Sequence, residues 1–324
     1  MVLRTRLTER LGLRHPIVSA PMGYVSGGAL AGAVSGAGGL GLIGGGYGDA
    51  AWLQAQFAAA GNQAVGCGFI TWSLAKQPEL LDLVLDHEPR AVMLSFGDPA
   101  PFAGAIRDAG AVLILQVQTL AHARTALANG ADIVVAQGTE AGGHGASRAT
   151  MTLVPEVRDL CARERPEVLV LAAGGIADGR GLAAALTLGA DGVLVGTRFY
   201  ASSEALVSPA HKAAAVAADG DATVRTKTVD IVRRLDWPAP YDLRTLRNAF
   251  VARWHGREAA LSADVDEAAE RYAAAAARGD AAESGVLVGE GIGLVDEVRP
   301  AAEIVETMAA EAETALLTGA ALIA

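Results

Sequence analysis

The strongest constraint on the fold is a repeated alternation of short apolar runs with longer Ala- and Leu-rich segments. The runs are continuous rather than alternately apolar and polar, which is typical of parallel strands covered on both faces. The phrases DAGAVLI, ANGADIVV and LGADGVLV repeat one unit, in which a glycine ends a helix and a strand follows. This pattern predicts strands at residues 17–20, 39–44, 64–70, 91–96, 111–117, 132–137, 168–174 and 192–196.

Eight parallel strands separated by helices predict an α/β fold, a (β/α)8 TIM barrel, with an open doubly wound sheet as the alternative. The alternation stops after Tyr200. Residues 208–288 show no clear strand and are rich in charge, with helices predicted at 242–255 and 264–278, and a last amphipathic helix is predicted at 300–324. We therefore expect a barrel of residues 1–207 and 291–324, and a smaller all-helical second domain of residues 208–290 that serves as a substrate or lid domain.

Charge and composition narrow the possible partners. The net charge of −10 argues against nucleic acid, so any bound anion must be held by local donors. Cys67 and Cys161 lie far apart without a CxxC motif, so neither a metal site nor a disulfide is predicted. Residues 16–48 carry no charge, but their prolines and glycines are unsuited to a bilayer, so no membrane association is expected. The start of the chain lacks an apolar signal segment, which predicts a cytoplasmic protein.

Barrel enzymes carry their reactive groups at the carboxyl ends of the strands, where this chain is rich in glycine. Glycine N–H groups beside a helix start bind phosphate without a lysine, so the ends of the last two barrel strands predict a phosphate site. Tight packing of helix on strand is the alternative explanation of these glycines. Asp178 is expected to cap the next helix. The strand-end residues in question are Ala20, Pro21, Met22 and Gly23 after the first strand, Ala173, Gly174 and Gly175 after the seventh, and Gly196 and Thr197 after the eighth.

His144 is the leading catalytic candidate. It follows the sixth strand in a glycine-flanked loop, so we expect it to be exposed at the barrel mouth. Histidine exchanges protons near neutral pH, which suits a general base. Glu140 either orients this loop or is solvated. Gln116 and Gln137 end the fifth and sixth strands and are placed to meet the edge of a heterocyclic ring, although Gln116 could instead point outward.

Taken together, these motifs resemble the nitronate monooxygenase family, also called 2-nitropropane dioxygenases. The matching strings are APMG at 20–23, AGGHG at 141–145, AAGGIADGRG at 172–181 and VGTRF at 195–199, with a fainter echo in GEGIGLV at 289–295. The resemblance implies FMN in the barrel, its phosphate on the turns after strands seven and eight, and His144 as the catalytic histidine. It also implies flavin contacts from residues 20–23, from the third strand near Gly68, and from Gln137 and Gly142.

The implied reaction is the oxidation of an alkyl nitronate with dioxygen to a carbonyl compound and nitrite, with His144 as base or as anchor for the anion. Three departures leave the substrate open: many relatives have an asparagine near Gly68, some have a lysine at Gln116, and some have a glutamine before Gly196. The scaffold is also similar to NAD(P)H:quinone and enoyl-type reductases, which is the alternative function. A flavin-free barrel that binds a phosphorylated metabolite is a third possibility, and a homodimer is left open.

Overall fold

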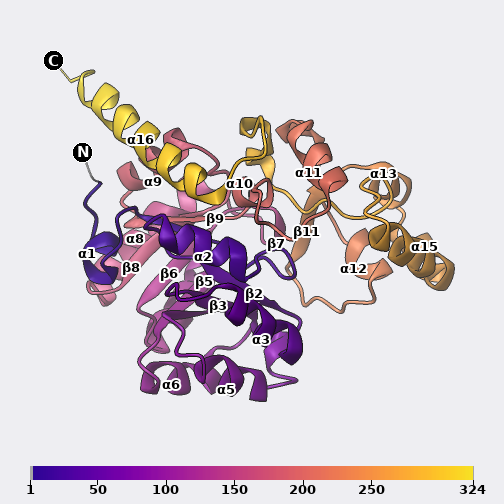
Figure 1. The fold of residues 1–324 in the computed structure, drawn as a ribbon, viewed down its shortest axis with the longest axis horizontal. Helices are drawn as coiled ribbons and strands as arrows, with labels where there is room; N and C mark the ends of the chain where they lie inside the picture. Colours follow the sequence, from indigo (N-terminus) through magenta and orange to yellow (C-terminus); the bar gives the residue numbers. More distant parts are fainter. Residues whose placement is uncertain (1–2, 324) are drawn as a thin grey trace.

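The computed structural model describes residues 3–323 and confirms the predicted barrel (Figure 1). Eight parallel strands follow the order β1-β9-β8-β6-β5-β4-β3-β2. A bridge between Val18 and Leu40, with the Ser19 N–H 3.0 Å from the Leu40 carbonyl oxygen, closes the sheet between its two ends. The barrel strands are β1 (Ile17–Ser19), β2 (Leu42–Gly46), β3 (Gly66–Ile70), β4 (Ala91–Ser95), β5 (Val112–Val117), β6 (Ile133–Gln137), β8 (Leu169–Ala173) and β9 (Gly192–Val195).

Helices surround this sheet in the expected alternation. The predicted last helix, α16, packs against α9 and α2 and so lies between them in the outer ring of helices. Asp178 caps α9 as predicted, because its side chain accepts a hydrogen bond from the Gly181 N–H at 3.0 Å. The barrel helices are α1 (Arg6–Leu11), α2 (Gly28–Gly36), α3 (Ala50–Ala59), α4 (Thr71–Leu74), α5 (Glu79–Leu85), α6 (Ala100–Asp108), α7 (Leu120–Ala128), α8 (Thr150–Glu164), α9 (Gly179–Thr187), α10 (Thr197–Tyr200) and α16 (Ala301–Ala320).

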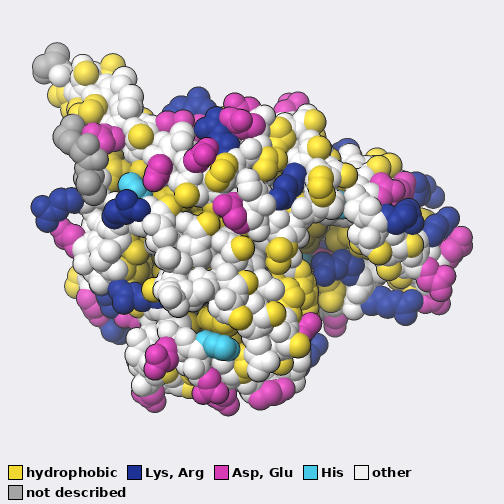
Figure 2. Space-filling model, in the orientation of Figure 1, with side chains coloured by type: hydrophobic (Ala, Val, Ile, Leu, Met, Phe, Trp, Pro, Cys, Tyr) yellow, Lys and Arg dark blue, Asp and Glu magenta, His cyan; other side chains and the backbone are white. Residues whose placement is uncertain are grey.

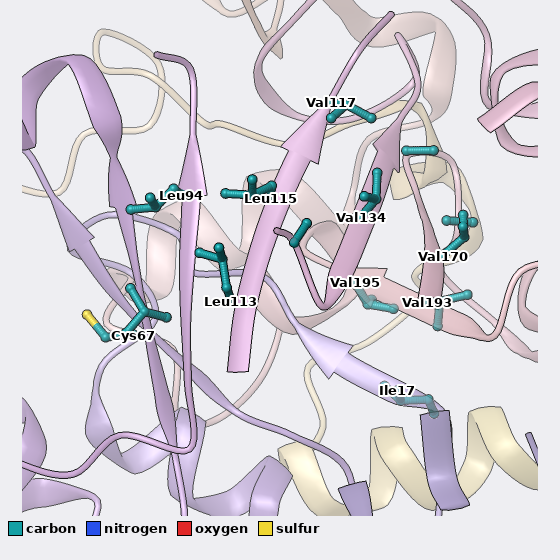
Figure 3. Close-up of a cluster of buried hydrophobic side chains, with 14 of the residues drawn as sticks. Ile17, Cys67, Leu94, Leu113, Leu115, Val117, Val134, Val170, Val193 and Val195 are labelled. Atoms are coloured by element: carbon teal, nitrogen blue, oxygen red, sulfur yellow. The ribbon is translucent and has the colours of Figure 1, made fainter. Parts of the chain in front are cut away.

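The strands are apolar on both faces because each face packs into a separate core. Outward-facing side chains such as Leu113, Val134 and Val193 pack beneath the helices (Figure 3). Inward-facing neighbours such as Ile114 and Val135 fill the barrel interior together with side chains from α1. The alternation between two buried faces explains why the sequence shows continuous apolar runs. A filled interior leaves only the carboxyl end of the barrel for a ligand.

The second domain lies to one side of the barrel, with α12, α13 and α15 furthest from the chain termini (Figure 1). It is mostly helical, but it also contains two strands that the sequence analysis missed. These strands contain arginine and threonine and span only four or five residues, so they lack the apolar run used to find the others. The elements are α11 (Pro209–Val216), η1 (Gly220–Ala222), β10 (Thr223–Thr226), α12 (Thr228–Val232), β11 (Asp242–Leu246), α13 (Ala249–Trp254), α14 (Glu258–Ala263), α15 (Val265–Ala277) and η2 (Glu290–Leu294).

The first part of the predicted helix 242–255 is therefore wrong, because residues 242–246 form β11 and the helix begins at Ala249. β11 pairs on one side with β10 and on the other with β7 (Gly143–Gly145), a short strand that follows β6 of the barrel. This three-stranded antiparallel sheet joins the second domain to the barrel. The boundaries proposed between the two domains remain a prediction.

The surface charge and the length of the helices bear on the predictions about nucleic acid and membranes. Figure 2 shows acidic and basic side chains interspersed over the face in view. No helix within residues 3–323 is both long enough and apolar enough to cross a bilayer. The uncharged stretch at 16–48 forms β1, α2 and β2, with turns between them.

Candidate active site

One cavity at the carboxyl ends of the barrel strands collects every residue that the sequence analysis assigned to the site. Its wall on the barrel side comes from the carboxyl ends of all eight barrel strands and the turns after them. The second domain adds Arg233, Trp237 and Leu287, and Gly291 lies just past the predicted boundary of that domain. The predicted residues that line it are Ala20, Pro21, Met22, Gly23, Gly68, Gln116, Gln137, Gly142, His144, Ala173, Gly174, Gly175, Gly196 and Thr197.

The turn after β8 has the features of an anion site. Gly174 and Gly175 have φ values of +100° and +74°, a conformation that side-chain-bearing residues rarely adopt. Within residues 3–323, neither of these N–H groups donates a hydrogen bond to a protein acceptor. A Cβ atom on Gly174 would lie 2.9 Å from the Gly138 carbonyl oxygen, so the turn has no room for one. Free N–H groups on a cavity wall fit a phosphate, and the turn is consistent with the phosphate end of FMN.

The neighbouring turn after β9 is tied to the second domain. The Thr197 hydroxyl accepts a hydrogen bond from the Gly289 N–H at 2.9 Å, and the Glu290 N–H donates to the Glu140 carbonyl oxygen at 2.9 Å. A Cβ on Gly142 would meet the Gly289 nitrogen at 2.6 Å, so the two loops touch through their backbones. The GEGIG segment noted in the sequence therefore packs directly on the AGGHG loop.

His144 lies in β7, where its backbone pairs with Leu243 of β11. The expectation that it would be exposed is wrong, since its side chain is only 7% exposed. The Trp237 ring stacks on the imidazole with 3.3 Å between centroids and 9° between planes. Trp237 belongs to the segment between α12 and β11, so the second domain covers the histidine while leaving it on the cavity wall.

Asp230 of α12 is the hydrogen-bond partner of His144. The Nε2 atom lies 3.0 and 2.9 Å from the two carboxylate oxygens. Burial lowers the pKa of His144 below its usual value, although Asp230 opposes this shift. A neutral imidazole that donates from Nε2 to a carboxylate carries no proton on Nδ1. No described residue hydrogen-bonds to Nδ1, so this atom is free to accept a proton.

The two predicted glutamines form a hydrogen-bond network with Gln118 and the backbone of His144. Gln137 donates to the His144 carbonyl oxygen at 3.0 Å and accepts hydrogen bonds from Gln116 at 3.1 Å and from Gln118 at 2.9 Å. Gln116 therefore points toward the site rather than outward. Glu140 orients its loop, because it accepts hydrogen bonds from the Thr150 N–H and hydroxyl at the start of α8.

Aromatic side chains that the sequence analysis did not select complete the wall. Trp237 donates to the Tyr47 hydroxyl at 3.0 Å, and its ring lies 5.1 Å from that of Phe96. Phe96 follows β4 with a φ of +64°, which is unfavourable for an aromatic residue and typical of functional sites. Because Phe96 directly follows a barrel strand, its position in the sequence could have identified it as a site residue. Nothing in the sequence identifies Asp230 or Trp237, because they lie in a region that shows neither a motif nor a strand pattern.

Arg233, also missed, is the only Lys, Arg, Asp or Glu among the described residues that line this cavity. Its guanidinium lies 5.4 Å from the centre of the Tyr47 ring. The cavity therefore combines one fixed positive charge, a neutral histidine, free N–H groups and an aromatic wall. This arrangement suits a small anion bound beside a flat cofactor.

Comparison with known proteins agrees with this geometry. The family model for nitronate monooxygenase matches residues 4–65 and 70–311. A nitronate monooxygenase of Neurospora crassa is 34% identical, covering 92% of this chain and 89% of that protein. An octahydro-indene-carboxyl-CoA dehydrogenase of Mycobacterium tuberculosis is 33% identical over the whole of both chains. The structure of FabK from Thermotoga maritima is 31% identical with a TM-score of 0.87, covering 99% of this chain and 100% of that one.

These likenesses span both the barrel and the second domain, and they agree with the motifs at the strand ends. They identify the chain as an oxidoreductase. The chain belongs to the nitronate monooxygenase family.

Proposed function

We propose that the protein is an FMN-dependent enzyme that oxidises alkyl nitronates with dioxygen to a carbonyl compound and nitrite. The observation that carries this proposal is the buried, neutral His144, held by Asp230 on the cavity wall that also carries the free N–H groups of Gly174 and Gly175. The family match supports the substrate class. A small nitronate and dioxygen are the proposed partners, with the cytoplasm as the proposed location and a homodimer left open.

The glycine turns after β8 and β9 would hold the FMN phosphate, with Gly68, Gln137 and residues 20–23 beside the ring. When bound, FMN supplies an electron-accepting ring. His144 Nδ1 removes the proton from the carbon that bears the nitro group, and Asp230 stabilises the imidazolium that results. Arg233 then offsets the negative charge of the nitronate. Trp237 shields the imidazole from water, which keeps its pKa low and its base form populated at neutral pH.

The experiment is oxygen uptake by the purified protein with the anion of nitroethane, together with nitrite release and the visible spectrum. The proposed function predicts a yellow protein that consumes oxygen with the nitronate and leaves NADH unoxidised. Bleaching of the flavin by NADH or NADPH without a nitronate would instead favour the reductase. That second candidate is supported by the dehydrogenase that is 33% identical over the full length of this chain.

Asp230→Asn tests the assignment of the base. Because the charge of Asp230 raises the pKa of His144, its removal lowers that pKa further. We expect the acid limb of kcat/KM for a neutral nitroalkane to move to lower pH, and kcat/KM at its plateau to fall at least about tenfold. Profiles over about pH 5 to pH 8 measure both effects. An acid limb that stays in place while activity falls would show that Asp230 acts only on the structure.

Trp237→Ala predicts a shift of opposite sign. The indole buries His144, and burial is the largest influence lowering the pKa of this histidine. Without the indole the pKa rises toward its ordinary value, so the acid limb moves to higher pH. Trp237→Phe serves as the control, because it retains a ring over the imidazole and removes only the hydrogen bond to Tyr47. Equal shifts in the two variants would contradict the role of burial.

A further inference from the structure

A second cavity adjoins the candidate active site on the far side of Phe96. It lies against the outer face of β4 and β5 near their carboxyl ends, beside α7, and it shares Phe96 and Gln116 with the main cavity. Its volume is about 440 Å³, whereas an apolar cavity of about 150 Å³ already holds a benzene ring. The space is therefore large enough for a six-membered ring or a branched alkyl group.

The wall of this side pocket defines what it can bind. No Lys, Arg, Asp or Glu lines it among the described residues, and its lining includes Trp72, Phe96, Pro99, Leu115 and Tyr241. Among the described residues on the wall, His122 is the one titratable base, and burial lowers its pKa, which favours the neutral form. A charged ligand group would lose its hydration here without gaining a partner. The pocket is thus suited to an uncharged apolar group.

The side pocket lies close to the proposed base. Phe96, which separates the two cavities, adopts a backbone conformation that is costly for an aromatic residue. Its ring lies 6.4 Å from that of His144, so the side pocket begins one ring width from the proposed base.

We propose that the side pocket binds the apolar substituent of the substrate, an aryl or branched alkyl group, while the reacting carbon stays beside His144. This inference rests on the proposed function and adds a preference for nitronates larger than that of nitroethane. The preference for large over small substrates then depends on residues of the side pocket that take no part in the chemical step.

Thr125→Phe tests the proposal by placing a ring at the edge of the pocket, where Thr125 is exposed on α7. Ala121→Phe is the matched control, because Ala121 is exposed on the same helix and does not line the pocket. We expect the ratio of kcat/KM for the anion of 1-nitro-2-phenylethane to that of nitroethane to fall at least tenfold in Thr125→Phe and to stay unchanged in Ala121→Phe. An unchanged ratio in a Thr125→Phe protein with normal thermal unfolding would overturn the proposal.

Binding of an inert probe separates this proposal from the proposed function. Calorimetric titration of the FMN-loaded protein with benzamide should show binding that weakens at least fivefold in Thr125→Phe, while acetamide binds to neither protein. If benzamide binds with this pattern but the protein does not oxidise nitronates, the side pocket is supported as a binding site and the proposed reaction is rejected. Equal benzamide binding by the wild type and Thr125→Phe would reject the side pocket.

Discussion

Replacing His144 by asparagine is expected to lower kcat/KM for a neutral nitroalkane by about 10²- to 10⁴-fold, the usual contribution of a general base. Asparagine keeps a polar side chain beside Asp230 but cannot accept and hold a proton near neutral pH. The glycine turns that would bind the FMN phosphate are not altered by this change, so the flavin content should equal that of the wild type. Initial rates of nitrite release and the visible absorbance of the purified variant measure the two quantities.

The preformed nitronate provides the internal control for this variant. Because the nitronate has already lost its carbon-bound proton, its oxidation should fall much less than that of the nitroalkane. His255→Asn, a substitution in the second domain away from the cavity, should leave both rates unchanged. Turnover of the nitroalkane at the wild-type rate would remove His144 from the mechanism. Equal losses with nitroalkane and nitronate would instead assign it to binding of the anion.

The barrel was predictable because each of its strands is buried on both faces. Runs such as residues 111–117 and 132–137 are continuous and apolar, and a glycine marks the helix end before each of them. Gly110 and Gly130 do adopt left-handed conformations, with φ values of +76° and +75°. The strands of the second domain lack both signals, since the β10 and β11 sequences contain Arg225 and Arg244. These arginines face the loop after β6, where both donate to the Thr139 carbonyl oxygen.

The candidate site, like the fold, has a part that was predictable from the sequence and a part that was not. Residues at the ends of barrel strands were predictable, because the fold fixes where those ends meet. The groups around His144 were not, because Asp230 and Trp237 reach it only through the pairing of β7 with β11. That pairing joins segments about a hundred residues apart by backbone hydrogen bonds, which leave no pattern in the sequence. It also explains the burial of a histidine whose flanking glycines indicated an exposed loop.

Gly174→Ala is expected to weaken the binding of FMN strongly. The φ of +100° disfavours any residue with a Cβ, at a cost of about 1–2 kcal/mol. The added methyl group would also lie 2.9 Å from the Gly138 carbonyl oxygen and 3.0 Å from the Thr150 hydroxyl. Relief of these contacts moves the turn and its N–H groups away from the position of the phosphate. We expect the dissociation constant for FMN to rise about a hundredfold, about 2.7 kcal/mol of binding free energy.

Gly104→Ala is the matched control, because it makes the same chemical change in the middle of α6, where a Cβ meets no atom within 4 Å. It should leave FMN affinity unchanged and raise the free energy of unfolding by about 0.5–1 kcal/mol. Fluorescence titration of the apoproteins with FMN, and with riboflavin as a ligand that lacks the phosphate, locates the defect. If the turn after β8 binds the phosphate, Gly174→Ala weakens FMN strongly and riboflavin little. Equal weakening of both ligands would place the phosphate elsewhere in the cavity.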